Sequence, residues 1–230
     1  FIAQLVAKGE DVLFVGTKRQ ARLQVETQSK RVGMPCVTER WLGGTLTNFR
    51  TIRSRLARLE ELEKAELDGT ALQYSKKMIS MRKRELDKIK CNLDGIRTMT
   101  RLPGALIVID VHREHNAVRE ARKLSIPTVC LIDTDSDPDF ADIPIPGNDD
   151  AIRAIDTILV HLADAVEEGK KGRLTAQSDK DGDDAAGGRR RARRATGRTE
   201  GESAIEASTI SESMAGAPVE RSPSMAPVST

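Results

Sequence analysis

The sequence has few of the residue types from which catalytic and base-stacking sites are usually built. Aromatic residues make up only 3% of its 230 residues, with one Trp and one Tyr. The chain is therefore poorly suited to bind single-stranded nucleic acid by stacking the bases. Three His residues supply little material for general acid–base catalysis, and no Ser-His-Asp or Cys-His set can be assembled. These shortages give an enzymatic function little support.

Cysteines and long apolar runs are also scarce. Cys36, Cys91 and Cys130 lie far apart without a CxxC pair, so the sequence predicts neither a zinc site nor a disulfide framework. Scattered thiols fit a reducing, cytoplasmic compartment. No apolar run reaches about 18 residues, so we predict no membrane span, and no signal peptide is visible. Because the chain begins with Phe1, we interpret it as truncated at its N-terminus, where a further element of the fold would lie.

Short apolar runs that end at Gly or Asp predict a parallel α/β sheet. The expected strands are Val12–Val15, Cys36–Val37, Ala105–Ile109 and Pro127–Ile132, with a proline-interrupted edge strand or loop at 143–147. The expected helices are 18–32, 115–124 and a last one that Asn148 or Asp149 caps and that runs to about Glu168. Alternating strands and helices predict a three-layer α/β/α domain with a mainly parallel, flavodoxin-like sheet.

The turn after the first strand combines Gly16 with basic residues at the start of a helix, where backbone amides can hold an anion. Neither a GxGxxG motif nor a P-loop is present, so a nucleotide enzyme is poorly supported. A better functional interpretation is an RNA phosphate held by Lys18, Arg19 and Arg22. The alternative is an α/β enzyme that uses a nucleotide or phosphate, with its site near Gly16, Asp110 and Asp133.

Two segments resemble parts of metal sites without completing one. His112 and His115 are three residues apart, but no third ligand is specified. The acidic loop 133–142 opens like a calcium-binding loop, yet Pro138 and Pro144 stand where an EF-hand needs Gly and Glu. We therefore predict no metal or other cofactor. The carboxylates of this loop either hold a hydrated cation beside RNA or simply shape the loop.

A helical insertion separates the two halves of the sheet pattern. Its apolar residues recur at intervals of three, four and seven: Phe49, Ile52, Leu56, Leu59 and Leu62, then Ile79, Leu86, Ile89 and Leu93. This spacing predicts a coiled-coil hairpin with arms about 30 Å long and a tip near Asp68-Gly69. From Asn48 to Lys90, twelve basic side chains minus seven acidic ones leave a net charge of +5. This charge favours docking onto folded RNA, while a solvated coiled coil is the alternative.

The stretch from Arg40 to Phe49, RWLGGTLTNF, joins the sheet to this insertion. Its Gly-Gly pair permits a sharp turn or a close backbone approach. Trp41 supplies an apolar anchor whose indole N–H still needs a partner. Thr47 or Asn48 can cap the helix that follows. We interpret the stretch as a fixed hinge, and a core Trp beside a tight turn is the simpler alternative.

Three blocks of the sequence resemble the bacterial family of the second protein of the small ribosomal subunit. They are VLFVGTKRQA (12–21), WLGGTLTNF (41–49) with the RTIRSRLARLEELE that follows, and DPDFADIPIPGNDDAIRAI (137–155). The resemblance covers roughly 10–172 and implies a helical hairpin inserted in an α/β domain. It also implies a structural, non-enzymatic component of the ribosome, with ribosomal RNA and neighbouring ribosomal proteins as partners. The large mRNA-binding protein one would be among those neighbours.

The composition changes near Arg173, where Asp, Gly, Ser, Ala and Arg begin to dominate. Such a segment buries too little apolar surface to offset its ordering entropy, so we predict a disordered tail. The expected parts are 1–47 and 99–172 for the α/β domain, 48–98 for the hairpin and 173–230 for the tail. The expected RNA-binding residues are Lys18, Arg19, Arg22, Arg40, Trp41, Arg50, Arg53, Arg55, Arg82, Lys83 and Arg84.

Overall fold

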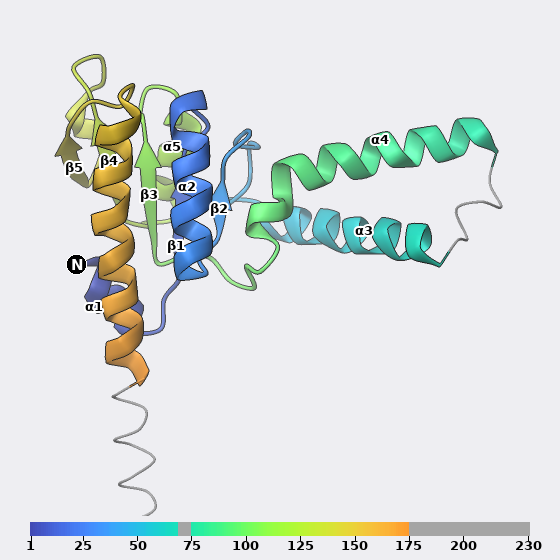
Figure 1. Ribbon diagram of the computed structural model, residues 1–230, viewed down its shortest axis with the longest axis horizontal. Helices are drawn as coiled ribbons and strands as arrows, with labels where there is room; N and C mark the ends of the chain where they lie inside the picture. The colour runs from blue at the N-terminus through green and yellow to red at the C-terminus, as the bar shows by residue number, and fades with distance from the viewer. Residues whose placement is uncertain (69–74, 175–230) are drawn as a thin grey trace, which may run out of the picture. The chain divides into compact units, whose positions relative to one another are not determined.

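Five parallel strands form the central sheet of the computed structural model, which describes residues 1–68 and 75–174 (Figure 1). The strands are β1 (Val12–Val15), β2 (Cys36–Val37), β3 (Ala105–Ile109), β4 (Thr128–Ile132) and β5 (Ile143–Pro146). Their order is β2-β1-β3-β4-β5, and every neighbouring pair is parallel. This is the doubly wound order of flavodoxin-like folds, so the predicted parallel three-layer class is confirmed.

The central strands are almost entirely apolar because both faces of the sheet are covered, and the one polar residue, Thr128 of β4, is hydrogen-bonded to Asp142. Every residue of β1, β3 and β4 is buried, in agreement with the continuous runs seen in the sequence. In contrast, β5 lies at the edge and is mostly exposed. Its prolines are tolerated there because an edge strand can leave one side without a hydrogen-bonding neighbour. Of the two structures expected from the sequence for 143–147, an edge strand or a loop, the edge strand is observed, at 143–146.

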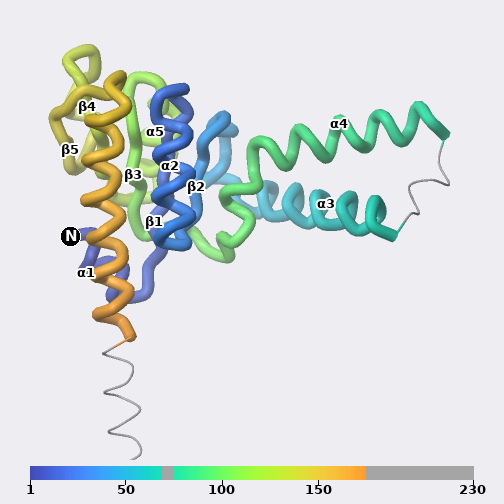
Figure 2. Tube along the Cα trace, in the orientation of Figure 1, coloured from blue at the N-terminus to red at the C-terminus, as the bar shows by residue number. Residues whose placement is uncertain are grey.

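One face of the sheet is covered by α1 (Ile2–Ala7), α2 (Arg19–Val32) and the last helix, 152–174. Figure 2 shows α2 and the last helix running side by side over the strands. Val25 of α2 and Leu159 of the last helix are fully buried in the cluster that contains Phe14 and Ile107 of the sheet. Asn148 shapes the turn just before the last helix, since its Oδ1 accepts hydrogen bonds from the amides of Asp150 and Ala151 at 2.9 and 2.7 Å.

The opposite face is covered by α5 (His115–Lys123) and by the base of the helical insertion. The insertion consists of α3 (Phe49–Leu67) and α4 (Lys76–Leu93), followed by a short 3-10 turn, η2 (Asp94–Ile96). Ile52 and Leu56 of α3 share one buried cluster with Leu106 of β3 and Val118 of α5. The base of the insertion is therefore part of the core of the sheet domain.

Farther out, α3 and α4 pack mainly on each other (Figure 1). Leu59, Leu62 and Leu86 form a separate buried cluster, with the partly buried Ile89 against it. The predicted apolar spacing is thus divided between two cores. Asp68, at the expected tip, ends α3, and Gly69 lies outside the described residues. Of the expected tail, 173–230, residues 173 and 174 still belong to the last helix, and the rest lies outside the described residues. Within the described residues, no helix is both long and apolar enough to cross a membrane.

The small cluster around Leu59 should make the outer part of the insertion sensitive to single truncations. Leu59→Ala removes a fully buried side chain, so we expect a loss of about 2–4 kcal/mol in the free energy of unfolding. Leu67→Ala on the same helix is the matched control, because Leu67 is 86% exposed. Denaturant unfolding followed by circular dichroism measures both variants. Equal stability of the two would contradict the observed packing of α3 on α4.

Candidate nucleic-acid interface

A single carboxylate closes the stretch between β2 and α3. Oε1 of Glu120, on α5, accepts hydrogen bonds from the Trp41 indole at 3.1 Å and from the Gly44 amide at 2.7 Å. Its Oε2 accepts from the amides of Leu46 and Thr47 at 3.0 and 3.1 Å and from the Thr47 hydroxyl at 3.1 Å. The expected hinge is therefore held by a residue more than 70 positions away in the chain, and the indole N–H has its partner.

The environment of Glu120 stabilises its charged form. Burial alone favours a neutral carboxyl, but the hydrogen bonds from Gly44, Thr47, Trp41 and Leu46 outweigh it and lower the pKa of Glu120 below its ordinary value. The side chain is nevertheless only 9% exposed. An ionised carboxylate only accepts hydrogen bonds and therefore suits this set of donors, whereas a protonated one would direct a proton at a donor. The hinge thus depends on the buried charge of Glu120, and the backbone amides of the hinge stabilise that charge.

The two glycines of the hinge have different roles. Gly44 has a φ of +89°, in the left-handed region that side chains rarely adopt. At Gly43 the backbone is ordinary and an added Cβ would meet nothing within 4 Å. The expected cap of α3 is wrong in its detail. Asn48 occupies the N-cap position but its side chain accepts no amide, while the Thr47 hydroxyl is directed to Glu120.

Lys18 lies at the expected phosphate position but is surrounded by acidic residues. Its Nζ lies 2.8 Å from Asp149, 2.7 Å from Asp150 and 3.5 Å from Asp110, measured to carboxylate oxygens. Burial disfavours the charged ammonium, but the hydrogen bonds with Asp149 and Asp150 outweigh that cost and raise the pKa of Lys18 above its ordinary value. A phosphate would have to compete with these three carboxylates for the ammonium.

The two arginines beside Lys18 differ in their availability. Arg22 donates through Nη1 to Glu39 at 2.6 Å and through Nε to the Thr17 carbonyl at 3.1 Å. Arg19, at the start of α2, is exposed. Of the three expected phosphate ligands, Lys18 and Arg22 therefore already form ion pairs with carboxylates, and Arg19 is exposed.

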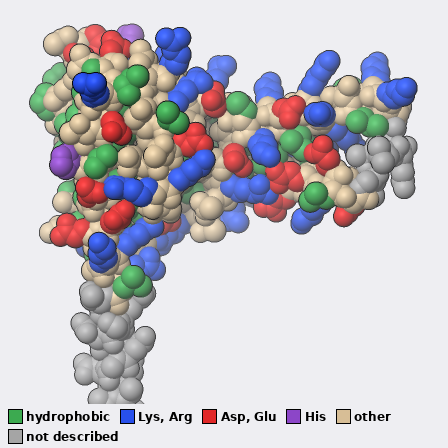
Figure 3. Space-filling view, in the orientation of Figure 1, with side chains coloured by type: hydrophobic (Ala, Val, Ile, Leu, Met, Phe, Trp, Pro, Cys, Tyr) green, Lys and Arg blue, Asp and Glu red, His purple; other side chains and the backbone are tan. Residues whose placement is uncertain are grey.

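The other expected RNA-binding residues lie on the hinge and the helical insertion. Arg40, Arg50, Arg53 and Arg55 are exposed, and Arg53 also donates to the Thr100 carbonyl at 3.2 Å. On α4, Lys83 and Arg84 are exposed and Arg82 is partly buried. Figure 3 shows many Lys and Arg side chains over α3 and α4, with acidic side chains between them. Trp41 is buried, so its contribution is to hold the hinge.

A second hydrogen-bonded group was not anticipated from the sequence. The Thr17 hydroxyl donates to the buried Glu114, and Arg113 donates from Nε to the same hydroxyl oxygen at 2.9 Å. Asp110 has a left-handed φ of 69° and accepts the Arg113 amide at 3.0 Å, which turns the chain after β3. Burial raises the pKa of Glu114. These partners come from the ends of β1 and β3, and no local pattern relates them.

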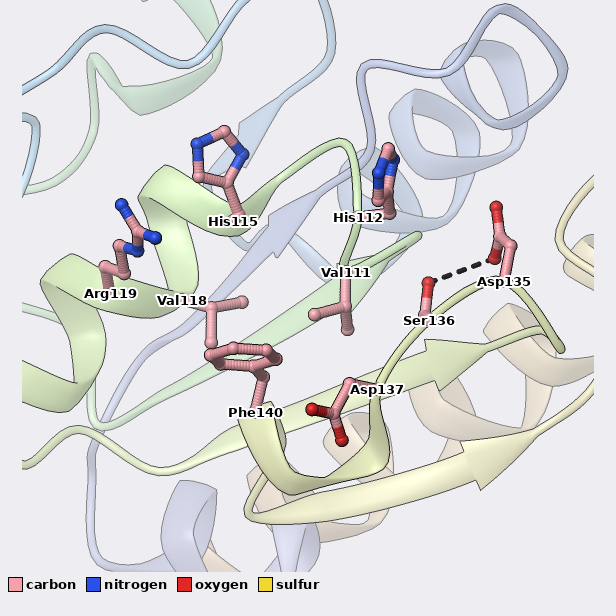
Figure 4. Close-up of a pocket in the computed structure, with 9 residues that line it drawn as sticks. All are labelled: Val111, His112, His115, Val118, Arg119, Asp135, Ser136, Asp137 and Phe140. Carbon is pink, nitrogen blue, oxygen red and sulfur yellow. Dashed lines mark hydrogen bonds between the residues drawn. The ribbon is translucent and has the colours of Figure 1, made fainter.

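His112 and His115 line a pocket of about 370 Å³ between the start of α5 and the loop after β4. Figure 4 shows Val118 and Phe140 at its apolar centre, with Asp135 and Ser136 on the facing segment. Across the described residues, no three His, Cys, Asp or Glu side chains are grouped so that they could bind a metal ion.

Several carboxylates of the acidic loop 133–142 accept hydrogen bonds from the loop itself or from β4. Asp133 accepts the Thr134 amide at 2.7 Å, and Asp137 accepts the Asp139 amide at 3.0 Å. Asp142 accepts both the amide and the hydroxyl of Thr128, at 2.8 and 2.9 Å. These bonds support the interpretation that the acidic residues shape the loop.

Comparison with known proteins identifies relatives along most of the chain. The family model described as ribosomal protein S2 matches residues 1–169. The chain is similar to the small ribosomal subunit protein uS2 of Rhodopirellula baltica, with 59% identity over 170 residues. The uS2 proteins of Acidothermus cellulolyticus and Leifsonia xyli subsp. xyli are 52% and 49% identical over 179 and 169 residues.

These alignments cover most of this chain but a smaller part of each relative. They include 74%, 77% and 74% of the chain, and 65%, 65% and 57% of the respective relatives. The chain therefore spans less than two thirds of the length of these curated relatives.

The charge of Glu120 should contribute strongly to stability. Gln offers one acceptor oxygen and turns an NH₂ group toward N–H donors, so we expect Glu120→Gln to lose about 2–4 kcal/mol of unfolding free energy at neutral pH. Because folding lowers the pKa of Glu120, its contribution is complete above the ordinary value of 4.5 and is lost as pH falls through the lower folded value. The difference in unfolding free energy between the parent and Glu120→Gln should therefore become smaller at acidic pH. Glu66→Gln, at an exposed site, is the control; a gap that widened in acid would refute the assignment.

The glycine pair provides a second, matched test of the hinge. Gly44→Ala forces a side chain into a left-handed backbone and brings Cβ to 3.3 Å from Cβ of Asn48, so we expect a loss of about 1–3 kcal/mol. Gly43→Ala should be nearly neutral, since it meets open space. Thermal unfolding of both variants measures the difference. Similar melting temperatures would mean that the turn at Gly44 is not required.

Proposed function

The chain belongs to the ribosomal protein S2 family, and we propose from this that it is a structural constituent of the small ribosomal subunit. The match over residues 1–169 is the observation that carries the proposal, because it includes the sheet, the hinge and the helical insertion. In this role the protein acts in the cytoplasm as part of the ribosome and catalyses no reaction. It binds ribosomal RNA and neighbouring ribosomal proteins, among them the large mRNA-binding protein one.

The exposed arginines at the base of the insertion support RNA attachment. Arg50, Arg53 and Arg55 follow the hinge directly, and Arg40 precedes it. Arginine suits this role because its planar guanidinium can donate two parallel hydrogen bonds to one phosphate. The hinge is rigid through Glu120, so these side chains start from a fixed backbone. RNA contacts would then order few additional residues, which lowers the entropic cost of binding.

The insertion would act as a coiled-coil arm of the α/β domain. The burial of Leu59, Leu62 and Leu86 between α3 and α4 supports such a seam. The proposed parts are residues 1–47 and 99–172 for the domain and 48–98 for the arm. Because the base of α3 packs into the domain core, the arm would carry its cationic surface at a defined angle.

The alternative of a nucleotide- or phosphate-using enzyme has lost its best support. The ammonium of Lys18, which would bind the phosphate, is hydrogen-bonded to Asp149 and Asp150 and lies near Asp110. Three carboxylates around this position repel an anionic substrate. The geometry at the end of β1 favours an internal ion cluster.

Association with the small subunit tests the proposed function directly. We expect the full chain to sediment with small ribosomal subunits from which the native homologue has been washed at high salt. A chain that stayed in the supernatant at low salt would refute the proposal. Ribosomal RNA binding by the free chain, measured against salt concentration, gives an independent readout.

The arginines at the base of the arm should matter more than its distal cations. We expect the triple variant Arg50→Gln, Arg53→Gln, Arg55→Gln to incorporate poorly into subunits. Each lost phosphate contact should lower the magnitude of the salt slope by about 0.7–0.9. The melting temperature should stay near that of the parent, because all three side chains are exposed.

A second triple variant removes the same charge from the outer part of the arm. It combines Lys64→Gln, Lys76→Gln and Lys77→Gln, all at exposed positions. If net charge alone attracts RNA, both triple variants should weaken binding equally. If the RNA-binding site lies at the base of the arm, the first triple variant should bind RNA clearly more weakly than the second.

A further inference from the structure

A polar pocket of about 370 Å³ lies where three neighbouring strands end. It is lined by Thr17 after β1, by Arg40 and Trp41 after β2, and by Arg113 and Asn116 after β3. The strands are adjacent in the order β2-β1-β3, so their carboxyl ends meet there. The connections leave β1 and β3 in opposite directions at this point, which is where doubly wound sheets bind ligands.

Arg113 is held in place by the end of β1. Its Nε donates to the Thr17 hydroxyl at 2.9 Å, and its amide donates to Asp110 at 3.0 Å. Thr17 is itself fixed, because its hydroxyl and amide both donate to Oε1 of the buried Glu114. The Nε bond uses one of the five N–H donors of the guanidinium. The donors on the terminal nitrogens remain for a ligand, on a side chain whose orientation is already set.

The two acidic residues of the pocket are both hydrogen-bonded within the protein and offset only part of its positive charge. Glu39 is paired with Arg22 at 2.6 Å. Glu114 is 3% exposed, accepts its bonds from Thr17, and has a pKa that burial raises. The charge of Arg113 acts on the nearby Glu114 carboxylate, but among the described residues neither Arg113 nor Arg40 forms a salt bridge. Both arginines border the pocket, and the Asn116 amide adds a neutral donor.

We propose that this pocket binds a phosphodiester group of RNA, with Arg113 and Arg40 as its ligands. Thr17 and Glu114 are positioning residues that orient the Arg113 guanidinium. The site rests on the proposed function, since the RNA is that of the small subunit. A phosphodiester fits because it carries one negative charge and two free oxygens, which match the guanidinium donors. Lys18 is not a ligand here, because its ammonium is held by the acidic cluster.

Substitutions of Arg113 separate its charge from its geometry. The full chain is titrated against small subunits washed free of the homologous protein, at several salt concentrations. Arg113→Gln should weaken binding about tenfold or more and lower the magnitude of the salt slope by about 0.7–0.9. Arg113→Lys should also weaken binding but leave the salt slope unchanged, because Lys retains the charge and loses the two parallel hydrogen bonds that a guanidinium can donate. Arg40→Gln should resemble Arg113→Gln.

Arg119→Gln is the matched control, because Arg119 is exposed on α5 and lines the separate pocket around Phe140. Melting temperatures verify that all four variants fold. If Arg113→Gln weakens binding no more than Arg119→Gln does, the pocket is not an RNA site. If the parent chain itself fails to bind, the proposed function fails as well, so the two failures are distinguishable.

Directed cleavage locates the RNA independently of affinity. In a Cys91→Ser background the remaining thiols, Cys36 and Cys130, are buried. An iron–EDTA probe attached through Asn116→Cys should then cut ribosomal RNA beside the pocket after assembly. A probe attached through Thr157→Cys, on the exposed side of the last helix, is the comparison. Absence of RNA cleavage from position 116 in assembled subunits would overturn the proposal.

Discussion

The carboxylate of Glu120 is the interaction on which the arrangement of the other elements depends. It connects α5, which lies on the sheet, with the hinge that leads from β2 into the helical arm. Four different hinge residues donate to it, so the backbone between Trp41 and Thr47 has one geometry and the start of α3 follows from it. Without this acceptor, several buried donors would lack partners, and each would cost about 1–3 kcal/mol.

Buried ionisable groups are paired within the protein, whereas most of the arginines on the arm are exposed to solvent. Near the ends of the strands, the buried ionisable groups are matched by the chain itself, as Lys18 is by Asp149 and Glu114 is by Thr17. Such groups set the local geometry, because their hydrogen-bonding capacity is already used within the protein. Arg50 and Arg55 are exposed on the arm, so their charge is available to an external anion. A basic residue next to a Gly turn is therefore a weak guide to phosphate binding until its acidic neighbours are known.

The apolar face of α3 packs on the sheet domain at one end and on α4 at the other, and this attaches the arm to the domain. Ile52 and Leu56 pack into the core of the sheet domain, whereas Leu59 and Leu62 pack toward Leu86 of α4. The same helix therefore belongs to the domain at its base and to the hairpin farther out. This continuity transmits the orientation of the hinge to the arm, because a helix resists bending over a few turns.

The sequence by itself determined the parallel sheet and the paired helices, since both depend on local periodicity. Strands buried on two faces must be apolar at every position, as Val12–Val15 and Ala105–Ile109 are, and helices that pack on one side must repeat every three or four residues. Only the tertiary structure decided how polar groups pair. Lys18 and Asp149 are separated by 131 positions, and Gly44 and Glu120 by 76. No local pattern relates such partners, because hydrogen bonds between distant residues are set by how the strands and loops come together.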